Sequence, residues 1–413
     1  MNRPIPSDQA LIPASIPIQL DGKPVEKITA FLFDQGGNDD PATLLANADK
    51  SFQGSIVLGM GFTFDDTNPD ATSIAEMHRL IDRDPRNQER IFPYIGGEEV
   101  NSSPTHSHHR YVINFFDLSE EEAWKYLDLM QIVKDKVKPE RDVQKRDALR
   151  IRWWQYAEKR PGLVKAIEQC DRVLVIPAAA TKYLNFVFLP SEMVFSHKLI
   201  VFSFDQYSHF ASIQSRIHEI WTQFFSATLE DRSTYNPSDC FETFPFHLEW
   251  ETNSTLEATG KTYYEFRADL MVRHNQGLTA TYNRFHDPDE TNPDILKLRE
   301  LHAECDRAVL NAYGWQDIPT DCEFLLDYED EDPEGSSKRK KPWRYRWSET
   351  IHDRVLARLL ELNQERAAEE IQGKTKRRKE PAKTATASSI DTVPHTPKQL
   401  DLIPPDTQQL DLL

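Results

Sequence analysis

Residues 226–246 read Ser-Ala-Thr-Leu-Glu-Asp-Arg-Ser-Thr-Tyr-Asn-Pro-Ser-Asp-Cys-Phe-Glu-Thr-Phe-Pro-Phe, and they mark the change from a mixed pattern to a helical one. An apolar stretch with helical spacing, from Ile213 to Leu229, leads into this segment, and aromatic residues up to Phe246 close it. The polar strip between them could place donors and acceptors against base edges and phosphates. The alternative is a polar loop that caps the preceding helix. The candidate DNA-binding side chains here are Glu230, Arg232, Thr234, Tyr235, Asn236 and Ser238.

Upstream of this segment, short strand and helix patterns alternate within one predicted domain, residues 54–246. The apolar runs predict strands at 54–64 (with a glycine break), 110–116, 172–176, 186–189 and 199–204, and a strand or turn at 91–100. Amphipathic spacing predicts helices at 71–84, 120–133, 145–160 and 208–229.

Downstream, the pattern predicts a mainly helical domain over residues 247–372. Asn292 and Pro293 form a helix start signal for residues 293–312, and residues 350–371 repeat the helical spacing. Residues 327–341 are predicted to be a charged, mobile linker, and residues 373–413 a disordered tail rich in Lys, Thr, Ser and Pro. Residues 1–53 are predicted to be an N-terminal arm. The expected fold class is α+β: a mixed α/β domain, then helices, then the tail.

The composition is that of an ordinary soluble globular protein. The chain has 413 residues, of which 39% are hydrophobic and 28% charged. Its four cysteines lack paired spacing, which argues against a disulfide framework or a structural zinc site and favours a reducing cytosol. No signal-peptide pattern and no apolar run near the ~20 residues of a membrane helix is present. These features predict a cytoplasmic protein with no membrane partner.

The formal net charge of −18 opposes nucleic-acid binding, because neutralising phosphates requires Lys and Arg. Basic residues are nevertheless concentrated in residues 134–160, 338–346 and 374–379. Arg150 and Arg152 precede Trp153-Trp154-Gln155-Tyr156, and basic residues interleaved with aromatics can follow a phosphate backbone. The alternative is a buried aromatic face with solvated basic side chains.

No catalytic or metal-binding residues can be assembled from spacing. An amino-methyltransferase needs an Asn/Asp-Pro-Pro-aromatic loop to hold its flipped base, and the nearest strings, such as Asn236-Pro237-Ser238, lack the second proline. Gly59-Met60-Gly61 lacks the third glycine of a nucleotide loop. The histidine clusters at 106–109 and 286–289 fall in predicted loops and are interpreted as structural.

The tail contains two similar peptides, residues 399–403 and 409–413. Each resembles the short motif that inserts into the groove of the bacterial sliding clamp, and a disordered segment can order on such docking. The candidate clamp-binding residues are Gln399, Leu400, Asp401, Leu402, Gln409, Leu410, Asp411 and Leu412.

Several strings occur in the order of one known family. They include Gly54 to Phe62, Pro93 to Glu98, Arg152 to Ala157, Ser215 to Trp221, Asp231 to Tyr235, Ser238 to Phe246, Leu278 to Pro288 and Ala312 to Trp315. This series resembles the C-terminal part of the MmeI-like adenine-specific DNA methyltransferases of restriction–modification and phage-defence systems. The resemblance covers about residues 20–370.

The resemblance implies that residues 54–246 are a target recognition domain that selects bases through the strip near Arg232, and that the helical segment after it braces the DNA. The family's methylating loop and S-adenosylmethionine site would lie upstream. We therefore expect this chain to bind no cofactor and to recognise double-stranded DNA for a separate catalytic chain that carries S-adenosylmethionine. Whether the chain is itself an enzyme stays open. The alternative is a non-catalytic DNA-binding adaptor tethered to the sliding clamp.

Overall fold

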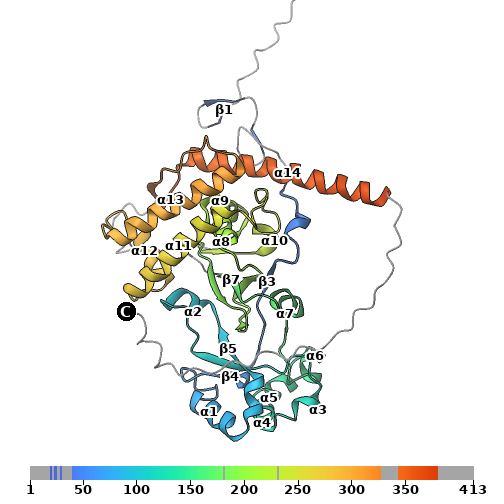
Figure 1. Ribbon diagram of the computed structural model, residues 1–413. Helices are drawn as coiled ribbons and strands as arrows, with labels where there is room; N and C mark the ends of the chain where they lie inside the picture. The colour runs from blue at the N-terminus through green and yellow to red at the C-terminus, as the bar shows by residue number, and fades with distance from the viewer. Residues whose placement is uncertain are drawn as a thin grey trace, which may run out of the picture.

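The computed structural model describes residues 19–20, 23–25, 28–29, 40–179, 182–229, 232–326 and 343–379, and of residues 19–20, 23–24, 227–229, 232–233 and 373–379 it describes the backbone alone. Two lobes are visible in Figure 1, each built on a four-stranded sheet. The lower lobe contains β4, β5, α1 and α3 to α6, and the upper lobe contains β3, β7 and the long helices α11, α13 and α14. Strands and helices mix in one chain, so the predicted α+β class is confirmed.

The lower sheet has the order β4-β6-β5-β9. Its strands are β4 (Thr63–Phe64), β6 (Arg110–Ile113), β5 (Ile91–Ile95) and β9 (Val194–Phe195). Strand β9 pairs parallel to β5, whereas the other pairs are antiparallel. Helices α1 (Ile74–Arg83) and α4 (Leu127–Lys136) contribute Met77, Met130 and Val133 to a core shared with Phe62 and Phe64. The predicted amphipathic helix at 71–84 is thus confirmed as α1, with Ser73 as its N-cap.

Three predictions in this lobe differ from the structure. The helix expected at 120–133 is divided into α3 (Glu120–Ala123) and α4. Of the strand expected at 54–64, only β4 and isolated bridges at Ser55 and Ile56 form, because Gly59 has a φ of 133° and a short 3₁₀ turn follows it. Of the expected helix at 145–160, only α6 (Asp147–Ile151) forms. Short helices α3 and α5 (Lys138–Asp142) complete this lobe, whereas α2 (Gly97–Ser102) packs against the upper lobe, where Val100 joins the core.

The upper sheet has the order β3-β10-β7-β8 and is antiparallel throughout. Its strands are β3 (Ser51–Gln53), β10 (Leu199–Phe202), β7 (Arg172–Pro177) and β8 (Val187–Pro190), and α7 (Pro161–Ile167) packs near β3. The last three strands lie where apolar, β-branched runs predicted them. Residues 51–53 were expected to belong to an arm, and the structure instead pairs them with β10.

The single helix predicted at 208–229 is wrong in detail. The structure has two buried helices, α8 (Tyr207–Gln214) and α9 (Arg216–Phe225), separated by Ser215 in an extended conformation. The chain then turns into a hairpin, β11 (Ala227–Leu229) and β12 (Arg232–Thr234), followed by the short helix α10 (Pro237–Cys240).

The helical segment packs onto the upper sheet through the same core. Its helices are α11 (Ser254–Arg273), α12 (Leu278–Phe285), α13 (Pro293–Tyr313) and α14 (Glu349–Lys379). The predicted start of α13 is confirmed, because the Asn292 side chain accepts a hydrogen bond from the Asp294 amide at 2.9 Å. One hydrophobic cluster runs from Ile95 to Leu360, so it crosses the predicted domain boundary at 246/247.

The segments predicted to be irregular are partly ordered. Residues 40–50 contact the upper lobe: the Ala42 amide donates to Asn363 Oδ1 and the Leu44 amide to the Glu242 carbonyl. The predicted linker, residues 327–341, lies outside the described residues, between β13 (Glu323–Leu326) and β14 (Trp343–Arg346). A small hairpin, β1 (Gln19–Leu20) and β2 (Lys23–Pro24), is described near the N-terminus. The backbone of α14 continues to Lys379, six residues beyond the predicted start of the disordered tail. None of the described helices combines the length and apolarity that crossing a bilayer requires.

Candidate nucleic-acid interface

The polar strip forms a β-hairpin. Strands β11 and β12 pair antiparallel, with Ala227 opposite Thr234 and Leu229 opposite Arg232. Residues 230 and 231, which separate the two strands in the sequence, lie outside the described residues. The predicted role of Glu230 therefore stays a prediction. Arg232 is the first residue of β12, and Thr234 is half-buried at the other end of the strand.

Tyr235 anchors the base of this hairpin. Its side chain is only 2% exposed, and its hydroxyl is 2.9 Å from His218 Nε2 on α9. Its ring packs edge-on against Phe186 and Phe202, and its amide donates to the Ala178 carbonyl at 2.9 Å. Burial raises the pKa of Tyr235 well above its usual value. The prediction that Tyr235 contacts DNA is therefore corrected: an apolar ring at the end of β12 gains more from the core than from solvent.

Asn236 and Ser238 are exposed just beyond the hairpin, where they form the start of α10. The Asn236 amide nitrogen donates to Asp239 Oδ2 at 2.7 Å, and Ser238 Oγ donates to Asn236 Oδ1 at 3.1 Å. These contacts lie within the segment that starts α10, and the Asn236 side chain forms no cap on that helix. They differ from the alternative that the sequence left open, a polar loop that caps the preceding helix. To contact a base, the Asn236 amide would have to exchange its bond to Asp239.

Arg150 and Arg152 lie in the other lobe, on and just after α6, and both are exposed. Arg150 Nη1 donates to the Gln144 carbonyl at 2.7 Å, and its guanidinium forms an ion pair with Asp147. Figure 1 places α6 in the lower lobe and α9 and α10, which flank the hairpin, in the upper lobe. The two sets of candidate residues are thus on different lobes.

The aromatic residues after Arg152 do not form a stacking surface. Trp153, Trp154 and Tyr156 are each less than 8% exposed, and they belong to the lower core. Trp154 Nε1 donates to the Leu118 carbonyl at 2.9 Å, and the Tyr156 hydroxyl donates to the Ile113 carbonyl at 2.8 Å. The alternative of a buried aromatic face is the correct one, because all three rings are buried and the polar tips of Trp154 and Tyr156 find backbone partners inside the fold.

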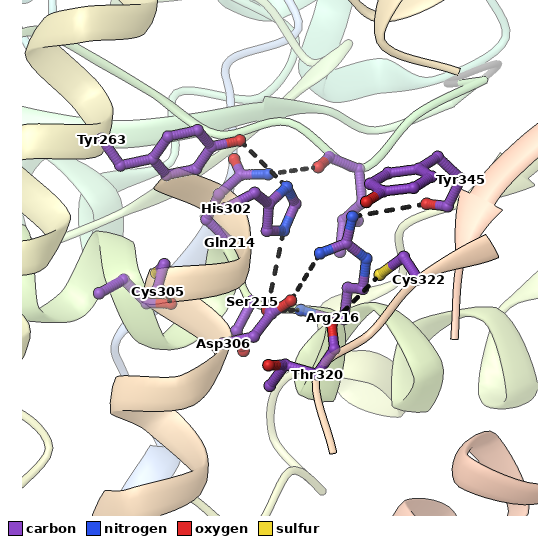
Figure 2. Close-up of polar contacts among 12 residues, drawn as sticks. Gln214, Ser215, Arg216, Tyr263, His302, Cys305, Asp306, Thr320, Cys322 and Tyr345 are labelled. Atoms are coloured by element: carbon purple, nitrogen blue, oxygen red, sulfur yellow. Dashed lines mark hydrogen bonds and ion pairs between the residues drawn. The ribbon is translucent and has the colours of Figure 1, made fainter. Parts of the chain in front are cut away.

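The helix that carries the hairpin is held at its start by a buried ion pair, which sequence reasoning missed. Asp306 of α13 accepts the Arg216 backbone N–H at 2.9 Å and Arg216 Nη1 at 2.6 Å (Figure 2). The two side chains are 0% and 3% exposed. Burial raises the pKa of Asp306 against the opposing effect of Arg216. We treat the pair as ionised, because both carboxylate oxygens accept short hydrogen bonds from Arg216. The Asp306 carboxylate also caps the N-terminus of α9, where backbone donors lack helical partners.

The neighbouring Gln214 connects the same junction to a loop of the upper sheet. Its Oε1 accepts from the Phe186 amide at 3.0 Å and from Arg267 Nη1 at 3.2 Å, and its Nε2 donates to the Leu184 carbonyl at 2.9 Å. Figure 2 shows Gln214 beside Tyr263 and His302 at the break between α8 and α9. The break between α8 and α9 is therefore held by side chains and backbone groups from distant parts of the chain. No local pattern in residues 208–229 indicates it.

The histidine clusters of the sequence serve packing. His286 stacks on Tyr183 with ring centres 4.7 Å apart, and its Nδ1 accepts the Tyr345 amide at 3.0 Å. Among the described residues, Glu349, His352 and Asp353 are the group whose ligand atoms lie close enough for a metal, and all three are exposed or half-buried. The clamp-motif residues 399–413 lie outside the described residues, and their role stays a prediction.

Buried histidines make the fold sensitive to acid. Burial lowers the pKa of His209 and His247 to about 4 and of His218 to about 3. In the unfolded chain each titrates near pH ~6.5, so unfolding takes up protons below that pH. We expect full stability above about pH 6.5 and a loss of up to ~1.4 kcal/mol per pH unit per histidine as the pH falls toward about 4. Urea denaturation measured across that range checks this; a flat free energy of unfolding would contradict it.

Comparisons with known proteins identify the family of this chain. A family model described as "MmeI, target recognition domain" matches residues 39–248, half of the chain. One solved structure, described as the type IIL restriction–modification enzyme MmeI in complex with DNA, superposes with a TM-score of 0.54 at 17% identity. The match covers 84% of this chain and 39% of that one, so this chain spans well under half the length of that enzyme. No curated protein matches the chain. The family match extends through both lobes and the hairpin, and the chain belongs to the MmeI target recognition domain family.

Proposed function

We propose that this chain is the sequence-reading portion of a site-specific adenine-N6 DNA methyltransferase of a restriction–modification or phage-defence system. Membership of the target recognition family supports a DNA-recognition role, and the solved relative contains DNA. The observation that carries the proposal is the β11–β12 hairpin. It lies inside the matched domain, places Arg232 at the start of β12, and is rooted on buried Tyr235.

Hairpins of this size can enter a DNA groove, and Arg bound bidentately to guanine is the commonest base-specific contact. A hairpin that recognises DNA bases needs a rigid support, because its hydrogen bonds to those bases require a geometry held within a few tenths of an ångström. The hydrogen bonds of Tyr235 to His218 and Ala178 provide that support, since they tie the end of β12 to both α9 and the end of β7.

Methyl transfer itself is assigned to a methyltransferase domain that carries an Asn/Asp-Pro-Pro-aromatic loop and binds S-adenosylmethionine. The nearest string here, Asn236-Pro237-Ser238, does not fit that chemistry. Its amide is bonded to Asp239 and it starts a helix instead of a loop. We therefore derive no catalytic step for the described residues and propose that the catalytic domain acts on a separate chain.

Selection from a pool of randomised DNA duplexes tests the proposal. The chain, alone and together with the catalytic chain, is expected to enrich a defined motif at low salt. Low salt is needed because salt screens the contacts between basic side chains and phosphates. The net charge of −18 already opposes DNA binding, so further weakening would hide it. Enrichment of no motif under either condition would refute the proposed function.

Arg232→Ala is expected to relax recognition at one base pair of that motif, by ~1–3 kcal/mol, while leaving the other positions unchanged. The same selection, repeated with the variant, measures this position by position. A uniform loss of affinity across all sequences, with a shallower salt dependence, would instead make Arg232 a phosphate contact. Arg79→Ala is the matched control, because Arg79 is an exposed arginine on α1 in the other lobe.

A further inference from the structure

The recognition hairpin is carried by α9, and α9 is oriented from its opposite end by the helical segment. The Arg216 backbone and guanidinium both donate to Asp306, at 2.9 and 2.6 Å. Arg216 Nη2 also donates to the Tyr345 carbonyl of β14 at 3.4 Å. A single buried arginine therefore fixes the start of α9 against α13 and β14 together (Figure 2).

Helix α9 acts as a short rigid lever. It begins at Arg216 and ends at Phe225, and β11 begins two residues later, at Ala227. Ten residues at ~1.5 Å each give a lever of ~15 Å. A rotation of ~5° at its start would move the far end by ~1 Å, which is more than a base-reading hydrogen bond tolerates. The hairpin root at Tyr235 lies beside the same helix, through His218.

We infer that Arg216 and Asp306 are positioning residues for base selection: the ion pair sets the angle at which α9 presents the β11–β12 hairpin to DNA. This inference rests on the proposed function of the hairpin. Neither residue contacts DNA in this mechanism. Their effect passes through the direction of the helix, so it falls on sequence discrimination and leaves non-specific phosphate binding intact.

A directional role explains why the site holds charges at all. Replacing a buried ion pair by apolar residues of similar size is often neutral or stabilising, so stability alone does not require one. An apolar pair, however, offers no acceptor for the Arg216 N–H and no bond to Tyr345. Methionine and leucine at these positions can fill the volume, but they do not specify the helix angle.

The test uses the full chain with the double substitution R216M/D306L and the randomised duplex pool. We expect the variant to remain folded, with its thermal stability lowered at most by the unpaired N–H of residue 216, and its affinity for a scrambled duplex to stay within about twofold. The affinity ratio between the selected motif and the scrambled duplex should fall by about tenfold or more. If the wild-type ratio survives in R216M/D306L, the inference is overturned.

The matched control is E99L/R110M, on α2 and β6. Glu99 also receives a backbone N–H at a helix start, from Gly96 at 3.1 Å, and an arginine contact, from Arg110 Nε at 2.7 Å. That pair orients α2, which carries no recognition hairpin, so discrimination should be retained. An equal loss in the control would show a general effect and would also overturn the inference.

The experiment distinguishes failure of the proposed function from failure of the positioning role. A wild-type chain that enriches no motif removes the proposed function, whereas a discriminating wild type with an equally discriminating double variant removes only the positioning role. Should R216M/D306L fail to fold, Asp306→Asn carries the test. Asparagine removes the ion pair but can still accept the Arg216 N–H. Full discrimination by folded Asp306→Asn would overturn the inference.

Discussion

Asp306→Asn is expected to lower the free energy of unfolding by about 3–5 kcal/mol, because it leaves the Arg216 guanidinium buried without a compensating charge. Asparagine can still accept the Arg216 N–H that Asp306 Oδ1 accepts now, so the loss reports the charge more than the helix cap. Arg216 is 3% exposed, and water cannot replace the missing carboxylate without opening the junction between α8 and α9. Chemical denaturation of the purified variant measures the difference.

Two comparisons isolate the charge effect. Asp317→Asn removes a carboxylate that pairs with Arg354 and Arg358 on the surface, and we expect little change there because exposed pairs are screened by solvent. R216M/D306L should recover much of the stability that Asp306→Asn loses, since no charge remains buried. A loss below about 1 kcal/mol in Asp306→Asn would mean that the guanidinium finds another partner.

Gly260→Ala is the second substitution with a large expected effect. A Cβ at this position would lie 2.3 Å from the Tyr207 carbonyl oxygen and 3.1 Å from Ala211 Cβ. Both atoms belong to α8, against which α11 packs. A backbone oxygen cannot move like a side chain, so the two helices must separate. We expect a destabilisation of about 2–3 kcal/mol, even though alanine favours the helix itself.

Gly162→Ala is the control for Gly260→Ala. Gly162 also lies in a helix, α7, but its added Cβ would meet only the Phe52 ring at an ordinary 3.4 Å. Here the helix preference of alanine acts alone, and we expect a small gain, of ~0.5–1 kcal/mol. Thermal unfolding of both variants shows whether the sign of the change follows the crowding. A neutral Gly260→Ala would indicate that α8 and α11 can shift without cost.

These predictions locate the sensitive part of the molecule at the contact between the recognition domain and the helical segment. Asp306 and Gly260 belong to α13 and α11, and both act on the α8–α9 pair that leads to the hairpin. The helical segment is therefore more than an appended brace: it completes the core beneath the proposed reading element. We expect a chain ended near residue 247 to expose that core.

The sequence by itself determined the regular elements whose stability is local. The strands at 172–176 and 199–204 and the helices at 71–84 and 293–312 follow from apolar periodicity and capping, because each element must bury one face and satisfy its own ends. The resemblance of ordered strings also identified the family correctly. Arg150 and Arg152 were correctly expected on the surface, because solvated charges do not depend on distant partners.

The positions at which helices are interrupted, and the polar groups that become buried, depend on tertiary contacts. The helix predicted at 208–229 is interrupted at Ser215 because Asp306, 90 residues away, takes the Arg216 N–H. Tyr235 is buried although its neighbours in the polar strip are not, and Trp153 to Tyr156 are buried beside exposed arginines. Residues distant in sequence provide a core and hydrogen-bond partners for these rings. The apolar periodicity of a segment indicates which of its side chains must be buried. The residues that bury them, and the groups that complete their hydrogen bonds, depend on the packing of the whole chain.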